Sequence, residues 1–159
     1  MSLYLCAAVY QQAIEQLLRT LEMDDSFPAT HHRLGLAYSS SGLHKEAIDH
    51  CLAATRLSEE SPQALGALAY AYARSGETEK ANDLLQRLVA LSRSRFVSAA
   101  IVAEVCLGLE QFDQALDWLD TAVRERSAAI PRLRVDPRFD CVRSHPRFQR
   151  VIEQTGSKD

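Results

Sequence analysis

Apolar and small residues recur along the chain with a period of 34 residues, and no gap is needed across four units. The two clearest columns hold Ala13, Ala47, Ala81 and Ala115, and Leu17, Cys51, Leu85 and Leu119. Within each unit, apolar positions stand three or four residues apart, the spacing that places them on one face of a helix. No alternating pattern with hairpin turn residues occurs. The sequence therefore predicts an all-α protein.

Each unit is expected to form two helices joined by a short turn. In the second unit, Ser39–Gly42 ends the first helix, and Gly42 suits a left-handed position. Ser61 and Pro62 begin the third unit as an N-cap and a first-turn proline. The period divides the chain into an incomplete repeat over 1–27, full repeats over 28–61, 62–95 and 96–129, and a different segment over 130–159.

The first repeat begins at the eighth position of the period, so half of its first helix is missing. A single repeat cannot bury its own hydrophobic face, and the ends of a repeat array need capping. We therefore expect the chain to be cut from a longer protein that carries a catalytic, sensor or DNA-binding domain upstream.

The columns resemble the tetratricopeptide repeat (TPR) family from residue 1 to about residue 129. The small positions of that family match Gly35, Ala47 and Ala54, and its large aromatic position matches Tyr38 and Tyr72. The family's tryptophan column differs here, since it holds His31, Leu65 and Ala99. The resemblance implies a right-handed TPR superhelix, an α-α solenoid of antiparallel helix pairs, whose first helices line a concave groove.

Helix geometry places one set of first-helix residues on a common face, separate from the packing stripe. The resemblance implies that this face lines the groove, with the partner-binding residues His32, Arg33, Leu36, Gln63, Tyr70, Arg74, Ile101 and Glu104. Arg33, Tyr70 and Arg74 suit an acidic or carboxylate-bearing peptide. The fourth repeat offers a more apolar surface that suits a hydrophobic side chain or a docked helix.

A competing interpretation is that Arg33 and Arg74 only solubilise the surface and pair with nearby acids. The two interpretations are separated by Arg33→Glu combined with Arg74→Glu, which abolishes partner capture without unfolding if the groove binds the partner. The chaperone-tail clamp known in the TPR family is not supported, because Leu36 and Ala67 stand among the positions where it needs Lys and Asn.

The period stops after residue 129, and the following segment contains the motif Pro-Arg-Phe twice. Asp136 and either Ser144 or His145 are expected to cap short helices that begin at Pro137 and Pro146. Their apolar face is supplied by Phe139, Val142, Phe148, Val151 and Ile152. We expect two or three short helices to cover the last repeat, followed by a disordered tail. This ending resembles the tails of bacterial multidomain signalling proteins, which join such repeats to transcription-regulator, cyclase or protein-kinase domains.

The formal net charge of −3 does not favour a general nucleic-acid binder. Charge is unevenly distributed, because residues 124–150 hold eight arginines and three acids whereas residues 1–123 hold 9 basic and 16 acidic side chains. We expect the basic segment to fold back onto the acidic body, and contact with phosphate is the alternative. No run of 18 or more apolar residues occurs, which excludes a transmembrane helix.

No sequence motif for catalysis, nucleotide binding or metal binding is present. His31 and His32 are adjacent and cannot form an i, i+4 metal pair, and His31 is expected to pack in a large apolar column. The four cysteines are scattered and act as small hydrophobes, which indicates a reducing cytoplasm. We therefore predict a cytoplasmic protein without enzyme activity, cofactor or metal.

The expected function is non-catalytic protein–protein interaction. A peptide or partner segment binds in the concave groove, and the chain is the C-terminal part of a larger bacterial signalling or regulatory protein. The alternatives are a self-association (dimerisation) scaffold and a regulatory domain of an attached cyclase, kinase or transcription regulator. Neither a membrane nor a nucleic acid is expected as the partner.

Overall fold

The computed structural model describes the backbone of residues 3–156 and the side chains of residues 9–155. The predicted disordered tail at 157–159 and the side chains of Tyr4 and Cys6 lie outside the described residues. The elements are α1 (Leu3–Met23), α2 (Pro28–Ser40), α3 (His44–Leu57), α4 (Pro62–Ser75), α5 (Thr78–Leu91), α6 (Ala99–Gly108), α7 (Phe112–Arg124), the 3₁₀ helices η1 (Ile130–Arg134) and η2 (Pro137–Val142), and α8 (Pro146–Gly156). Over residues 3–156 no strand is present, which confirms the all-α prediction.

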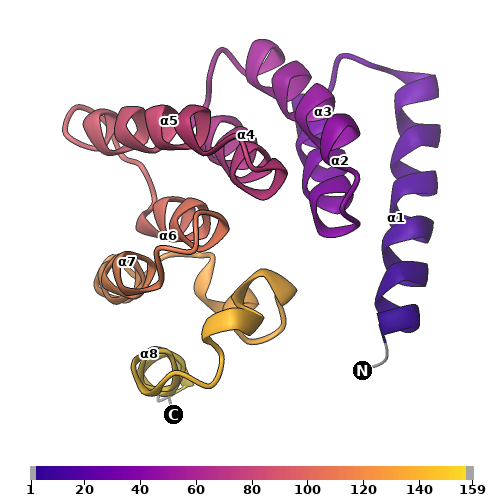
Figure 1. Ribbon diagram of the computed structural model, residues 1–159. Coiled ribbons are helices and arrows are strands. Elements are labelled where there is room, and N and C mark those ends of the chain that lie inside the picture. Colours follow the sequence, from indigo (N-terminus) through magenta and orange to yellow (C-terminus); the bar gives the residue numbers. More distant parts are fainter. Residues whose placement is uncertain (1–2, 157–159) are drawn as a thin grey trace.

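Successive helices pack against one another and form a curved array, an α-α solenoid (Figure 1). The pairs α2/α3, α4/α5 and α6/α7 are the helix pairs of the repeats, and α2, α4 and α6 also pack side by side along the inner side. None of the described helices is both long enough and apolar enough to cross a membrane.

Glycine permits the closest helix crossing. A Cβ atom added at Gly35 on α2 would lie 2.3 Å from Sγ of Cys51 on α3. The alanine and leucine columns at this crossing are buried in the later repeats, and the members with no exposed surface include Ala47, Cys51, Ala81, Ala115 and Leu119. The predicted packing stripe is therefore the core of the helix pairs.

The predicted turn and cap residues act as expected in the second and third repeats. Ser61 Oγ accepts the Ala64 N–H at 3.3 Å and caps α4. Gly42 and Gly76 end α2 and α4 with φ values of 76° and 88°. The equivalent residue of the fourth repeat, Glu110, has φ of 60°, so a non-glycine residue occupies the left-handed region there.

The first repeat differs from the later ones, because one continuous helix, α1, runs over Leu3–Met23. Where the later repeats turn at Gly42 and Gly76, the first has Ala8, which does not favour the left-handed conformation that ends a helix. The period therefore predicts a boundary that the residues at that point do not make.

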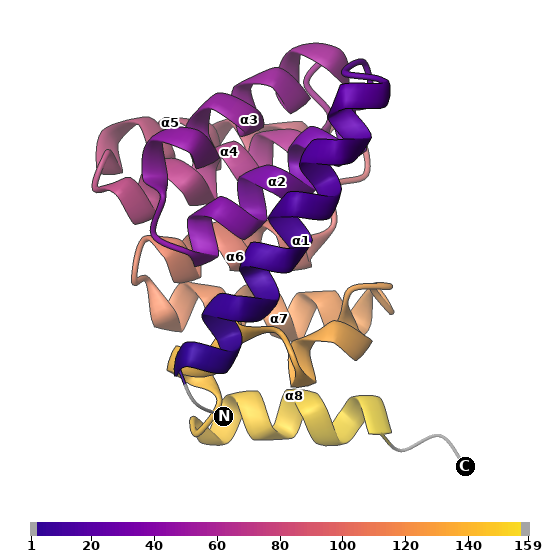
Figure 2. The same cartoon turned by 90° about the vertical axis from the view of Figure 1, so that its right-hand side faces the viewer.

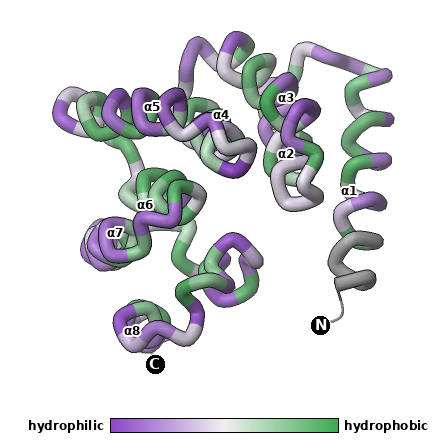
Figure 3. Tube along the Cα trace, in the orientation of Figure 1, coloured by the Kyte–Doolittle hydropathy of each residue, from purple (hydrophilic) through white to green (hydrophobic). Residues whose placement is uncertain are grey.

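The fourth repeat begins its first helix later than the period predicts. Phe96 stands where the second and third repeats have proline, it is 76% exposed, and α6 starts only at Ala99. The N–H group of Ala99, the first residue of α6, donates a hydrogen bond to Glu125 Oε2 at 3.2 Å. A side chain from the end of α7 therefore caps α6. Figure 3 shows that α6 is hydrophobic along most of its length, and it is packed between α4, α7 and η2.

The segment after residue 129 forms the helical cap, which we define as η1, η2 and α8. Asp136 caps η2 through the Arg138 N–H at 3.0 Å, and His145 rather than Ser144 accepts the Arg147 N–H at the start of α8. Phe139 and Phe148 are buried with their ring centroids 6.0 Å apart. The sequence predicts these capping residues, but two of the three helices are 3₁₀ rather than α.

Candidate partner-binding groove

The inner side of the array is lined by α2, α4 and α6, and small residues set their separation. A Cβ atom added at Gly66 on α4 would lie 2.3 Å from Cγ2 of Ile101 on α6. A Cβ atom added at Gly108 would lie 2.9 Å from Cδ2 of Tyr70. At these two positions, α4 and α6 therefore approach each other closely on the inner face.

The predicted groove residues differ in how much of each side chain solvent can reach. Arg33, Gln63 and Arg74 are exposed. Partly buried side chains are found at His32, Leu36, Ile101 and Glu104. Tyr70 is buried, with only 7% of its surface exposed.

The helical cap occupies the C-terminal half of the inner face. Arg138 of η2 donates to Glu104 Oε2 at 2.8 Å, and its guanidinium carbon lies 5.8 Å from the centroid of the Tyr70 ring. The same guanidinium pairs with Asp136 Oδ2 at 2.6 Å, and only 9% of the Arg138 side chain is exposed. Glu104 and Tyr70 are predicted from the sequence to face a partner, but they contact the cap of the same chain instead.

The ion pairs of Arg138 are buried, which determines the charge of each member. Burial raises the pKa of Glu104, and the Arg138 guanidinium opposes this increase. Burial also acts to raise the pKa of Asp136, but the hydrogen bond and the charge of Arg138 outweigh it, so that pKa is lowered. Burial disfavours the charge on Arg138, yet Glu104 and Asp136 keep the pKa of the guanidinium above its ordinary value.

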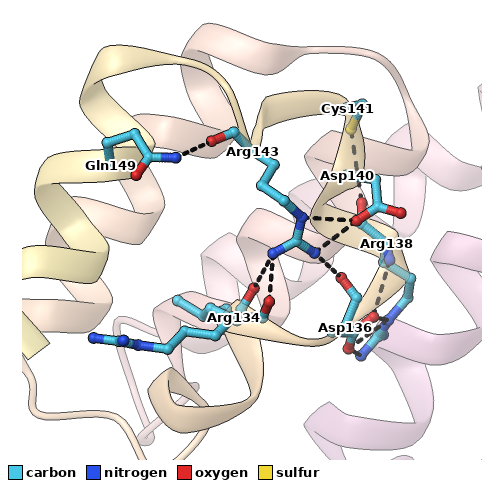
Figure 4. A network of polar contacts seen from close by, with 8 residues as sticks. Arg134, Asp136, Arg138, Asp140, Cys141, Arg143 and Gln149 are labelled. Carbon is cyan, nitrogen blue, oxygen red and sulfur yellow. Dashed lines mark hydrogen bonds and ion pairs between the residues drawn. The ribbon is translucent and has the colours of Figure 1, made fainter. Parts of the chain in front are cut away.

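Arg143 connects the parts of the cap (Figure 4). Its guanidinium donates to Asp140 Oδ1 at 2.9 Å from Nε and to the Asp136 carbonyl at 3.0 Å, and it also reaches the carbonyl of Arg134. Gln149 of α8 donates to the Arg143 carbonyl. These bonds hold η1, η2 and α8 together as one unit on the inner face.

The cap also makes ion pairs with the acidic body, as the charge distribution predicts. Arg147 at the start of α8 donates to Asp117 Oδ1 at 2.6 Å and to Asp120 Oδ2 at 2.7 Å, both on α7. Together with the bond from Arg138 to Glu104, these pairs link the basic segment to α6 and α7. The cap is therefore attached to the array by charge as well as by its buried phenylalanines.

The N-terminal half of the inner face remains open. A cavity of about 540 Å³ lies between α1, α2 and the cap. Its lining comprises Tyr10, Ala13, Gln16 and Leu17 from α1, Arg33, Leu36, Ala37 and Ser40 from α2, and Arg132, Asp136, Pro137 and Arg138 from the cap. We call this cavity the open groove. It has an apolar floor and arginines at its rim.

The rim of the open groove carries excess positive charge. Within the described residues neither Arg33 nor Arg132 makes a hydrogen-bonded ion pair, whereas the carboxylate of Asp136 is bound to Arg138. His32 lies close by, and its pKa is lowered by burial and then by the charges of Arg138, Arg132 and Arg33. The imidazole therefore adds no positive charge at pH 7. Arg132 interacts electrostatically with Glu104 and Asp136, whereas Arg33 forms no ion pair within the described residues.

A second, smaller cavity of about 60 Å³ brings several predicted residues together. It is lined by His32, Leu36, Gln63, Ala67, Ala100, Ile101, Glu104, Ala129, Arg132 and Arg138. This volume suits one or two water molecules rather than a peptide. Arg74, by contrast, does not line the open groove or this cavity, so the predicted pair of Arg33 and Arg74 does not form one site.

Sequence reasoning missed the contributions of α1 and the cap to the groove. Ala13 and Leu17 occupy the columns that the first helix covers in the later repeats, and in the first repeat both line the open groove. This signal was present in the period. No equivalent signal exists for Arg132, because its place at the rim depends on how the irregular segment after residue 129 folds back.

Among the described residues, no group of three or more His, Cys, Asp or Glu side chains could hold a metal ion. Burial raises the pKa of Cys51 to about 12 and that of Cys106 to about 11, so both thiols are protonated at neutral pH. His31 packs between the helices of the second repeat, where its Nδ1 lies 3.0 Å from Nδ1 of His50.

The stacked antiparallel helix pairs, the small-residue crossings and the 34-residue period define a TPR-type repeat protein. Residues 40–122, just over half of the chain, match the family described as "Anaphase-promoting complex, cyclosome, subunit 3", and the chain belongs to this TPR-like family. Such repeats form protein–protein interaction modules, and they are generally non-catalytic. No curated protein and no solved structure matches the chain.

Proposed function

We propose that the protein binds a peptide or partner segment in the open groove, and that the groove recognises acidic groups on its partner. The observation that supports this proposal is the rim, where Arg33 and Arg132 form no hydrogen-bonded ion pair with any residue that the structure describes, over an apolar floor that includes Leu17 and Leu36. Arginine binds carboxylates through paired hydrogen bonds, and an apolar floor provides the area for packing. The partner is a protein, and the reaction at the site is binding alone.

The helical cap restricts the proposed site to the N-terminal half of the inner face. Because Glu104 and Tyr70 contact Arg138, a partner that used the whole face would have to displace a buried ion pair as well as the cap. We therefore expect the partner to reach Arg33 and Leu36 without contacting Glu104.

A peptide library displayed on phage tests this function directly. Selection on the purified protein should enrich peptides with acidic residues, and fluorescence anisotropy should show that Arg33→Glu combined with Arg132→Glu weakens the selected peptide at least about a hundredfold. The matched control is Arg56→Glu combined with Arg93→Glu, two exposed arginines that do not line the groove. If both double variants lose binding equally, charge alone is responsible and the groove is not the site.

We also propose that the chain acts in the cytoplasm as the C-terminal part of a larger bacterial signalling or regulatory protein. The support for this is the resemblance of the Pro-Arg-Phe segment to the tails of such proteins. Mass spectrometry of the endogenous protein tests it, because a species of 17.7 kDa, the mass of this chain alone, contradicts the proposal.

A further inference from the structure

In two columns of the repeat, the side chains are buried in the later repeats but only partly buried in the first repeat. Ala47, Ala81 and Ala115 have no exposed surface, whereas Ala13 in the same column is only partly buried. Cys51, Leu85 and Leu119 are likewise buried, whereas Leu17 is only partly buried. Both open residues line the open groove.

In the second repeat, the first helix α2 closes these columns. It packs against Ala47 and Cys51 of its own partner helix α3 and against Ala67 and Ala71 of the next first helix, α4. We call these four residues the seat of α2. These four residues cluster with Leu36 of α2. The helix therefore occupies a seat made by two helices.

The open groove repeats this seat one period earlier. Subtracting 34 residues from the four seat residues gives Ala13 and Leu17 of α1 and Arg33 and Ala37 of α2. All four line the open groove, whose other wall is formed by Arg132 of η1 and by Pro137 and Arg138 of η2. Figure 2 shows α1 at the edge of the array with α2 behind it. The groove thus has the form of a seat for a first helix.

We propose that the open groove binds an acidic amphipathic helix of a partner protein, which packs on Ala13, Leu17, Arg33 and Ala37 as α2 packs on the equivalent residues one period later. This inference rests on the proposed function and specifies the partner's shape. The chain's own first helices show which pattern fits, namely a large residue, a small residue and, three positions later, an aromatic one. Two examples are Leu34-Gly35 with Tyr38 and Leu68-Ala69 with Tyr72.

The repeat also indicates where the acidic residue of the partner helix lies. Gly66 of α4 approaches Ile101 of α6 closely, and Ile101 stands two periods after Arg33. A helix in the open groove therefore presents to Arg33 the residue that corresponds to Gly66. Because Arg33 has no ion-pair partner within the described residues, an acid at that position is complementary.

A labelled synthetic peptide tests the inference. It carries the sequence of α4, Pro62–Ser75, with Gly66→Glu, so that it combines the packing pattern with an acid facing Arg33. Fluorescence anisotropy should show binding to the wild-type protein. Two changes in the peptide should each weaken it about tenfold or more, namely Ala69→Leu, which fills the small position, and return to the native glycine at position 66, which removes the acid.

Variants of the protein locate the binding. Ala13→Leu occupies the seat and Arg33→Glu reverses the complementary charge, so each should weaken binding of the peptide about tenfold or more. The control variant Arg56→Glu on α3 carries the same charge change outside the groove and should leave binding unchanged. Circular dichroism on all three variants confirms that the helices are retained.

Other outcomes overturn the inference in distinguishable ways. If a version of the peptide with Ala71→Pro binds equally well, or if only library-selected peptides bind, the groove takes an extended segment and the proposed function survives without the helix. If sedimentation shows a dimer that excludes the peptide, the occupant is a second copy of the chain. If no peptide of any kind binds, the proposed function fails together with the inference.

Discussion

The two halves of the inner face are built from the same repeat yet differ in what covers them. In the C-terminal half, the cap places Arg138 between Glu104 and Tyr70, and the surface is closed. In the N-terminal half, Arg33 and Leu36 face an open groove beside α1. Figure 1 shows η1 and η2 of the cap on the inner side of the array, between α1 and α8.

The difference shows that a repeat fixes the path of the helices but not the use of their surfaces. The same small-residue columns are buried at the helix crossings of each full repeat, for example Ala47, Ala81 and Ala115. What covers the inner face depends on side chains outside the period. A segment of about 25 residues after the repeats is enough to cover half of the inner face.

The largest expected effect is on the closed half. Arg138→Met leaves the carboxylates of Glu104 and Asp136 in a buried site without their partner, and we expect a loss of about 3–5 kcal/mol in the free energy of unfolding. Urea denaturation measures this loss. Replacing both members of the pair, with Arg138→Met and Glu104→Leu, should restore part of the stability because the buried charge of Glu104 is removed as well.

The same variant should have a characteristic dependence on pH. Burial raises the pKa of Glu104 above 4.5, and removing Arg138 raises it further. The folded state then holds a proton that the unfolded state releases, so the free energy of unfolding falls as the pH rises above about 4.5. The variant should therefore be less destabilised at pH 5 than at pH 8. An equal loss in the free energy of unfolding at both pH values would mean that the Glu104 side chain becomes exposed to solvent in the variant.

Much of the fold could be predicted from the sequence, because the columns of Ala13 and Leu17 repeat without a gap and each helix boundary has local chemistry. Ser61 and Gly76 are examples whose side chain or backbone acts within a few residues. The single helix α1 was not predicted, since the period requires a turn at a position where Ala8 favours none.

The candidate site could be predicted only in part. Helix geometry places Arg33 and Leu36 on one face, the TPR resemblance implies that this face is the inner one, and both residues line the open groove. Their neighbours from the cap could not be found in this way, since η1 and η2 have no period, and the pairing of Arg138 with Glu104 joins residues far apart in the chain. Long-range contacts of an irregular segment leave no pattern in a single sequence.

A matched pair of substitutions sharpens the contrast between open and closed positions. Ala47→Leu inserts three carbon atoms where the crossing of α2 and α3 has no space, so we expect a loss of about 1–3 kcal/mol in stability. Ala13→Leu makes the same change in the same column beside the open groove, and we expect a change below about 0.5 kcal/mol. Thermal unfolding of both variants provides the comparison. Equal losses would show that the column of α1 is closed in solution.

The smallest expected effect concerns the turns between the paired helices. Gly42 and Gly76 adopt positive φ at the ends of α2 and α4, and Glu110 adopts the same conformation at the end of α6. The hydrogen bonds that close these turns are equivalent. The Glu77 N–H donates to the carbonyl oxygen of Tyr72, and the Gln111 N–H donates to the carbonyl oxygen of Cys106, both at 2.9 Å. A side chain costs roughly 1–2 kcal/mol in this conformation.

Glu110→Gly should therefore stabilise the protein by about 0.5–1 kcal/mol, after allowance for the greater freedom of glycine in the unfolded chain. Gly76→Ala at the equivalent turn should destabilise it by a similar amount, which makes the two variants opposite tests of one conformation. Urea denaturation at neutral pH measures both. Because Glu110 is exposed and outside both halves of the inner face, peptide binding should not change. A destabilised Glu110→Gly variant would show that its side chain contributes more than the strain of its backbone costs.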